Sequence, residues 1–193
     1  GDDIRAKLFA EREALAANTE DFAVTAVLPS LLLGPGDLRG SSTEDVRNFL
    51  ERKVVAIPPG GLSFVDVRDA ALATLSAIDR GRPGARYLLG GCNLSMRAFF
   101  ERLSKISGVA MPVVTLPHTP ELARLGVELL GRWASRAGLS FGLDAVSTEM
   151  AHYTWYVDSS RARTELGFTP RDPATTLAET VADLRSRGVI WPE

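Results

Sequence analysis

The sequence predicts an α/β fold with parallel strands, followed by a mostly helical region. Three apolar or β-branched runs, at residues 22–28, 62–65 and 86–89, alternate with segments of helical periodicity up to residue 91. Such alternation is typical of α/β architecture. A proline-rich connector and further helical patterns follow. With 193 residues, 45% of them hydrophobic, the chain is long enough to bury a core without disulfides.

The first elements follow from periodicity and turn signals. Apolar residues recur at helical spacing over residues 3–17 and predict an amphipathic helix. The run at 22–28 has the length and β-branching of a buried parallel strand. Gly34-Pro35-Gly36-Asp37 predicts a turn, and residues 43–53 predict a second helix.

Capping residues place the next helices. Asp66 precedes a helical pattern at 67–79, and Ser95 precedes one that ends near Gly108, so both predict N-caps. Later helices are predicted at 121–137, 143–152, 159–166 and 173–187, with an extended stretch at 153–157. We therefore predict an α/β region over residues 1–110 and a mostly helical region over residues 111–193.

Composition excludes several classes of protein. Lys and Arg total 22 against 24 Asp and Glu, a net charge of −2, which argues against a broad nucleic-acid surface. No apolar run reaches the roughly 18 residues that a membrane span needs. The single cysteine, Cys92, excludes an intrachain disulfide and fits a reducing compartment, so we expect a cytoplasmic protein.

Histidine usage predicts no metal site. His118 and His152 are isolated from each other, whereas metal sites need clustered ligands. His118 lies in the connector Leu-Pro-His-Thr-Pro, where it would either line a substrate cleft or contribute only surface polarity.

The glycine-rich segment 34–40 has two interpretations. It follows a strand and precedes a helix, as a phosphate-binding turn does. However, Pro35 lacks an N–H donor, Asp37 would repel a phosphate, and the glycine spacing differs from that of the dinucleotide fingerprint. A structural turn is the favoured interpretation.

Five segments, taken together and in order, resemble the extended short-chain dehydrogenase/reductases, and among them the NAD-dependent epimerase/dehydratase and dihydroflavonol-reductase-like branch. The segments are KLFAE at 7–11, PSLLLGPGD at 29–37, FVDVRD at 64–69, GARYLLGG at 84–91, and DSSRA with ELGF at 158–168. The resemblance implies the C-terminal part of a Rossmann-like parallel sheet. It also implies NAD or NADP as cofactor, bound mainly by an upstream half, and a substrate-binding role for the mostly helical region over residues 111–193. The start without Met, directly in a helical pattern, agrees with a fragment.

The resemblance also implies site residues. In this family a lysine binds the nicotinamide ribose and, four residues after a tyrosine, lowers the pKa of that tyrosine for proton transfer. Lys7 matches the lysine, but the tyrosine position holds Asp3. A carboxylate beside a lysine cation stays ionised and is a poor acid for protonating an alkoxide.

The resemblance also implies roles for the residues at the end of a strand and for one arginine. Residues Pro29, Ser30, Leu31 and Leu32 would lie where the family backbone contacts the nicotinamide carboxamide, or would simply end a strand. Arg68 would reach a substrate phosphate or carboxylate, or form a surface salt bridge with Asp69 or Glu44.

Two hypotheses about function follow. The first is a fragment of an NAD(P)-dependent oxidoreductase or epimerase that transfers hydride at a carbonyl or secondary alcohol of a small molecule, either a nucleotide-sugar or a flavonoid- or terpenoid-like compound. The second is a non-catalytic ligand-binding or interaction module on the same scaffold, suggested by Asp3. Either way we expect the chain alone to be inactive without its upstream half, and the first helix resembles one that the family uses for homodimer packing.

Overall fold

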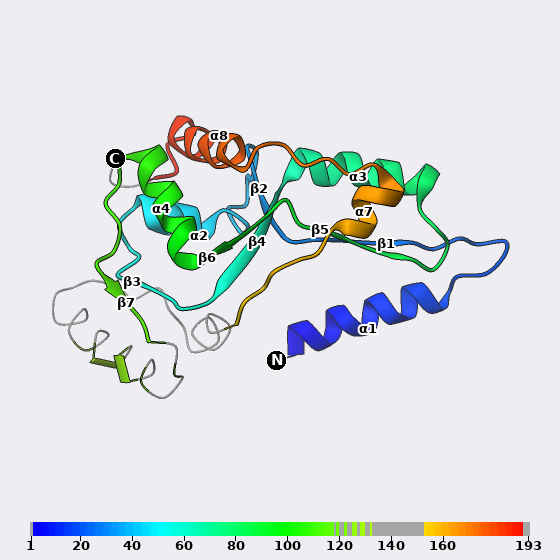
Figure 1. The fold of residues 1–193 in the computed structure, drawn as a ribbon, viewed down its shortest axis with the longest axis horizontal. Helices are drawn as coiled ribbons and strands as arrows, with labels where there is room; N and C mark the ends of the chain where they lie inside the picture. The colour runs from blue at the N-terminus through cyan, green and yellow to red at the C-terminus, as the bar shows by residue number, and fades with distance from the viewer. Residues whose placement is uncertain are drawn as a thin grey trace.

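The computed structural model describes residues 2–117 (side chains from residue 5 onward), 119, 122, 125–126, 128–129, 132 and 153–190. Figure 1 shows the arrangement of the chain. The six helices of this described part are α1 (Asp2–Ala16), α2 (Glu44–Leu50), α3 (Val67–Arg80), α4 (Met96–Ser107), α7 (Ser160–Leu166) and α8 (Pro173–Ser186). The strands are β1 (Ala26–Pro29), β2 (Leu31–Leu33), β3 (Ala56–Ile57), β4 (Gly61–Asp66), β5 (Arg86–Leu89), β6 (Cys92–Ser95) and β7 (Val114–Thr115).

Parallel pairing dominates the strands. β1 pairs with β5, β2 with β4, and β3 with β7, each in parallel, while β6 adds to β4 in antiparallel orientation. Helices α3 and α7 lie on one side of the β1–β5 pair, and α1 lies on the other side (Figure 1). The predicted α/β fold class with parallel strands is confirmed.

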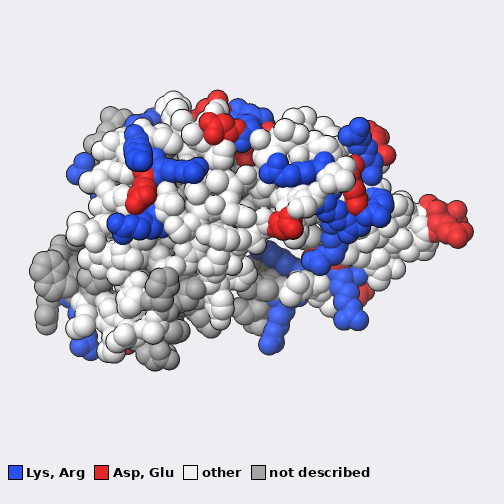
Figure 2. Space-filling view, viewed as in Figure 1, with Lys and Arg blue, Asp and Glu red and all other residues white. Residues whose placement is uncertain are grey.

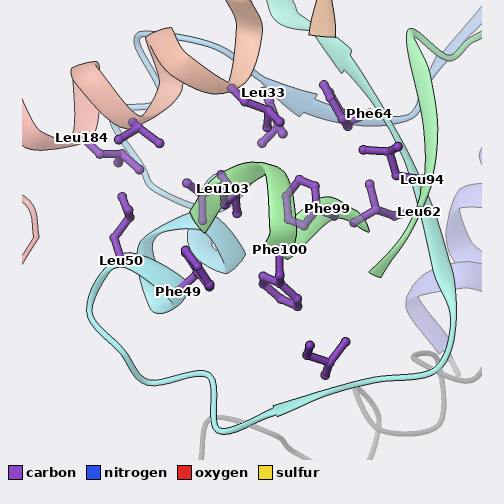
Figure 3. Packing of buried hydrophobic residues seen from close by; sticks show 14 of the residues in the cluster. Leu33, Phe49, Leu50, Leu62, Phe64, Leu94, Phe99, Phe100, Leu103 and Leu184 are labelled. Carbon is purple, nitrogen blue, oxygen red and sulfur yellow. The ribbon is translucent and has the colours of Figure 1, made fainter. Parts of the chain in front are cut away.

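The larger core lies between helices and the β2–β4–β6 sheet. Aromatic residues fill it: Phe49 of α2 stacks on Phe100 of α4, and Phe99 packs against Phe64 of β4 (Figure 3). Residues of α8, including Leu177 and Leu184, close the same cluster. Because α2, α4 and α8 bury their apolar faces in one cluster, they hold the sheet and its edges in place.

A second, smaller core lies under α3 and α7. Tyr87 and Leu89 of β5 are fully buried there, together with alanines of α3 and Leu166 of α7. The hydroxyl of Tyr87 donates to the carboxylate of Glu165 and accepts from the backbone N–H of Arg82 at 3.0 Å. The buried phenol is thereby satisfied, as a buried hydroxyl requires.

The β1 and α1 region is less covered than the rest. All six residues of β4 are buried, whereas those of β1 are half-buried or exposed, and β1 has one strand neighbour in the described part of the chain. Of the α1 side chains from residue 5 onward, only Glu11 and Leu15 are half-buried, and Leu8 and Phe9 are 58% and 66% exposed. A helix of this length is marginal in water without tertiary packing.

Two predicted boundaries moved for local reasons. The strand predicted at 22–28 begins only at Ala26, because the Asn18 side chain accepts from Val24 N–H at 2.9 Å and Thr19 from Phe22 N–H at 3.1 Å, which fold this stretch into a turn. The helix predicted to extend to Lys53 ends at Leu50. Arg52 has a left-handed backbone conformation, which a continuing α-helix does not allow. The helices predicted at 121–137 and 143–152 lie largely outside the described residues.

Figure 2 shows charged side chains of both signs on one face, with Lys and Arg gathered over α4 and again over the region of α3 and α7. In the part of the chain that the structure describes, no helix is both long and apolar enough to cross a membrane.

Candidate functional site

The carboxyl ends of β1 and β5 lie side by side. Pro29 is in register with Leu89, and the backbone N–H of the following Ser30 donates to the Leu89 carbonyl at 2.9 Å. Ligands of open parallel sheets bind outside the carboxyl ends of the strands. This edge is therefore the place to look for a site, and it includes the predicted residues Pro29 and Ser30.

Two serine hydroxyls, one at this edge and one in β4 of the neighbouring sheet, are buried without a hydrogen-bond partner among the described residues. They are the side-chain oxygens of Ser30 and of Ser63, the latter residue only 4% exposed. The Ser63 hydroxyl lies 2.7 Å from the position that a Cβ on Gly90 would take. Buried polar groups are normally satisfied, so such hydroxyls call for a partner from outside the described chain.

Leu31 and Leu32 continue from Ser30 into β2. Their backbones pair in parallel with Phe64 and Val65 of β4, and their side chains are half-buried. Thus the four predicted residues 29–32 span the junction of two strands that pair with different neighbours. Such a junction leaves the strand ends facing the ligand side of the sheet.

Lys7 lies on α1, one helical turn before Glu11. Glu11 forms an ion pair with Arg86 at the start of β5, which fastens α1 along the strand. Because α1 runs opposite to β1 and β5, its N-terminal end lies toward the carboxyl ends of these strands (Figure 1). The Lys7 side chain is exposed to solvent, and Lys7 also interacts with another residue of the chain.

A pocket of about 450 Å³ opens directly after β5, within the size range of small-molecule sites. It is lined by Gly90, Gly91, Cys92, Asn93, Tyr156, Val157, Asp158, Ser159, Ser160 and Arg163. The pocket is thus formed by residues at the end of β5 and the start of β6, together with residues between 156 and 163, which come much later in the sequence.

That segment, residues 153–159, is fastened to the sheet by hydrogen bonds at both ends. Trp155 N–H donates to the Gly61 carbonyl at 2.8 Å, and the Ser159 hydroxyl accepts from Gly90 N–H at 2.7 Å and donates to the Gly90 carbonyl at 2.8 Å. The Asn93 amide exchanges two bonds of 3.1 Å with the backbone of Val157. The pocket wall is therefore held by the framework.

Two of the side chains that line this pocket, those of Asp158 and Cys92, have shifted pKa values. Hydrogen bonds from the hydroxyl and the backbone N–H of Ser160 lower the pKa of Asp158, so this carboxylate is ionised at neutral pH. Burial raises the pKa of the Cys92 thiol, partly opposed by Arg102, so Cys92 is a thiol and not a thiolate.

Arg68 is engaged within the protein. Its guanidinium forms a two-point pair with Asp66, with bonds of 2.9 and 2.8 Å, and also contacts Glu179 of α8. The predicted surface salt bridge with Asp69 or Glu44 is wrong, because Asp69 instead accepts 2.8 Å bonds from the backbone and guanidinium of Arg171. A substrate role for Arg68 stays a prediction.

Asp66 ends β4 and caps α3, as predicted. Its carboxylate accepts from Arg68 N–H at 2.9 Å and from the Thr176 hydroxyl at 2.8 Å. Burial opposes ionisation, but the hydrogen bonds from Arg68 and Thr176 and the charge of Arg68 outweigh it and lower the pKa of Asp66 to about 2. These contacts join α3 to α8.

The glycine-rich turn 34–40 uses its N–H groups internally. Gly34 N–H donates to the Thr180 hydroxyl at 2.8 Å, Gly36 N–H to the Asp183 carboxylate at 3.2 Å, and Gly40 N–H to Asp37 at 2.9 Å. Because the donors that would cradle a phosphate are taken, the structure agrees with the structural turn.

Two predicted site residues, Asp3 and His118, have side chains that lie outside the part of the chain that the structure describes. Asp3 lies in α1, one turn before Lys7, with its side chain outside the description. His118 lies outside the described residues. Among the residues that the structure describes, no group of three His, Cys, Asp or Glu side chains is placed to hold a metal ion.

Two known proteins are similar to this chain over nearly its whole length. The chain is 32% identical over 191 residues to a putative dihydroflavonol 4-reductase of Synechocystis, and 30% identical over 192 residues to sterol demethylase protein B of Methylococcus capsulatus. The predicted resemblance to the extended short-chain dehydrogenase/reductases is confirmed. The chain spans 55% and 57% of the length of these two relatives and 96% of its own.

Solved structures that superpose on nearly the whole chain share its fold. A nucleoside-diphosphate-sugar epimerase from Pseudomonas aeruginosa superposes with a TM-score of 0.77 at 22% identity, over 98% of this chain and 57% of that one. An enzyme of the same species complexed with NADPH superposes with a TM-score of 0.62 at 20% identity, over 94% of this chain and 54% of that one. No protein-family model matches the chain.

The pocket after β5 escaped prediction from the sequence. Ser63 and Tyr156 carry no local signal, since neither lies in a recognisable motif. Of the residues that line the pocket, Gly90, Gly91, Asp158, Ser159 and Ser160 belonged to segments that carried the family resemblance. Glycines at 61 and 90 were the available hint, because glycine in or beside a strand often marks a close approach.

Proposed function

We propose that this chain is the C-terminal half of an NAD(P)-dependent oxidoreductase or epimerase that acts on a carbonyl or secondary alcohol of a small molecule. The observation that carries the proposal is the edge formed by the carboxyl ends of β1 and β5, where Ser30 has a buried hydroxyl without a partner and α1 runs alongside. The family relationship supplies the reaction class.

The residues present fit a nicotinamide. An amide-bearing ring needs a hydrogen-bonding group at the strand end, and the buried Ser30 hydroxyl, which has no partner among the described residues, would supply one. Lys7 would hold the ribose hydroxyls from α1. The cofactor supplies the hydride chemistry, and the protein binds and orients it.

The pocket after β5 would hold the substrate. It opens next to the strand end that would receive the nicotinamide, since Ser30 bonds to Leu89 and Gly90 lines the pocket. The relatives are named for reactions on a flavonoid, a sterol and nucleotide-sugars. The substrate is accordingly either a nucleotide-sugar or a flavonoid- or terpenoid-like compound.

An upstream half would complete the molecule. β1 lacks a second strand neighbour in the described part of the chain, and α1 exposes most of its surface. A Rossmann half placed N-terminal to α1 would pair with β1 and carry most of the cofactor contacts. The remaining surface of α1, including Leu8 and Phe9, would serve a homodimer.

A second candidate is a non-catalytic ligand-binding or interaction module, favoured by Asp3 at the position of the family tyrosine. An ionised carboxylate there would leave the cofactor bound without a proton donor for the alkoxide. Asp3→Tyr separates the two candidates. If the only defect is the missing phenol, this variant gains reductase activity, measured as NADPH consumption with a ketone substrate.

Calorimetric titration with NAD⁺ and NADP⁺ tests the proposal. It compares the 193-residue chain with the protein translated from its natural upstream sequence. We expect binding by the longer protein and little or none by the chain alone. If neither binds a dinucleotide, the oxidoreductase assignment fails and the interaction module replaces it.

A further inference from the structure

Helix α3 has three faces with different surroundings. Its buried face consists of small residues that pack on the strands in the smaller core, namely Ala70, Ala73 and Ala77. A second face contacts α7: the Leu166 carbonyl accepts from the Ser76 hydroxyl at 2.6 Å and from the Arg80 guanidinium at 3.5 Å. The strands and α7 therefore account for two of the faces.

The third face is an apolar stripe that is exposed in the described structure. It consists of Val67, Ala71, Leu75 and Ile78, which follow one another at spacings of three or four residues and so lie along one flank of the helix. Leu75 and Ile78 are 61% and 77% exposed. Exposed apolar side chains that gather on one surface mark an interaction site, whereas scattered ones need no explanation.

The stripe faces the unpaired side of β1. Helix α7 contacts both α3 and β5, so it occupies the flank of α3 on the β5 side. The stripe lies on the opposite flank, toward the edge of β1 that has no strand neighbour among the described residues. Helix α1 does not cover it, because α1 lies on the other side of the β1–β5 pair (Figure 1).

A helix in the same layer as α3 is the occupant that fits this geometry. A strand added at the free edge of β1 would need a cover on the α3 side, because parallel sheets are buried on both faces. A helix over that strand would lie alongside α3 at the usual interaxial distance of roughly 8–10 Å, with the stripe between the two. The chain matches only the C-terminal part of its two longer relatives, so the protein has the length to supply such a helix.

We propose that a helix of the upstream half docks on the stripe of α3. The upstream half would then contact this chain at two places, with a strand beside β1 and a helix beside α3. The inference deepens the proposed function and rests on it only in taking the chain as part of a longer protein. A second copy of the protein is the competing occupant, and the test separates the two.

The test is thiol labelling of the full-length protein without dinucleotide, with the rate at each position read by mass spectrometry and divided by its rate in urea. Leu75→Cys reports on the stripe. Leu72→Cys is the matched control, because Leu72 is 63% exposed and lies one turn before Ser76, on the α7 side of the helix. We expect Leu75→Cys to react at least about tenfold more slowly than Leu72→Cys, since a covered thiol reacts only after local opening.

Ile78→Cys gives a second measurement on the same stripe and should be protected in the same way. Equal rates at the stripe and at Leu72→Cys would overturn the proposal. Protection that disappears on dilution would also overturn it, because the stripe would then belong to a contact between two copies. If the stripe is protected in a protein that fails to bind NAD(P), the inference stands and the proposed function alone fails.

Discussion

Arg52 has a left-handed backbone, with φ of 58°, at the end of α2. Its N–H donates to the Phe49 carbonyl at 3.0 Å, and Lys53 N–H donates to the Asn48 carbonyl at 2.8 Å, which closes the helix in a geometry that glycine usually adopts. A side chain in this conformation costs roughly 1 kcal/mol.

We therefore expect Arg52→Gly to raise the free energy of unfolding by about 1 kcal/mol, measured by urea denaturation. Arg52→Ala is the control, since alanine keeps the strained backbone and should give no such gain. A lower stability for the glycine variant would show that the Arg52 side chain contributes more than its backbone costs.

Single residues also show what the sequence predicts well. Asp66 and Ser95 were predicted as caps from their own neighbours, and both accept the N–H bonds expected of a cap. The partners of Arg68 were not predictable in the same way, because Glu179 lies 111 residues away in sequence. Local chemistry can be read from the sequence, whereas partners supplied by folding cannot.

At the scale of elements, the α3–α8 contact is electrostatic. The folded-state pKa of Asp66 is about 2, below the roughly 3.9 of an unfolded aspartate. The stabilisation is therefore present above pH 4 and is lost as the pH falls through about 2. A pKa shift of this size corresponds to about 2 kcal/mol of stabilisation of the folded state.

We expect Asp66→Asn to lower stability at pH 7 by about 2 kcal/mol and to flatten the loss of stability between pH 4 and pH 2. Urea unfolding across this pH range measures both effects. Asp79→Asn, on the exposed part of the same helix, should change neither. A wild-type pH profile retained in Asp66→Asn would assign the acid sensitivity to other carboxylates.

The close approach of the 153–159 segment depends on Gly90. A Cβ there would lie 2.7 Å from the Ser63 hydroxyl and 2.9 Å from Cβ of Val157. Gly90→Ala should destabilise the protein by about 2 kcal/mol through overpacking. Adding Ser63→Ala relieves one of the two contacts and should restore part of the loss in thermal melting. No difference between the single and double variants would place the strain elsewhere.

Elements were predictable where a long helical pattern or an apolar run bounded by glycines marked them. The helices at α1, α3, α4 and α8 and the strand at 86–89 were predicted to within a few residues. The strands β2, β3, β6 and β7 have two to four residues, too few for a periodic signal. Their positions depend on partners such as β4, which only the folded sheet supplies.

At the scale of the whole molecule, five short segments indicated the fold and the family, because their order along the chain is itself informative. The division into regions 1–110 and 111–193 stays a prediction. The pocket after β5 could not be predicted, since it joins the end of β5 and the start of β6 to residues 156–163. Among the described residues, β1 has one strand neighbour and α1 exposes most of its surface.

The central claim is that Lys7 and the strand edge beside it hold a nicotinamide dinucleotide. Calorimetric titration of the full-length protein with NADPH tests it in Lys7→Met against Arg5→Met, two changes that each remove one cation from the same helix. The account predicts a dissociation constant at least tenfold higher for Lys7→Met, the scale of a lost charge-assisted hydrogen bond, and little change for Arg5→Met. Equal affinities in the two variants would contradict it.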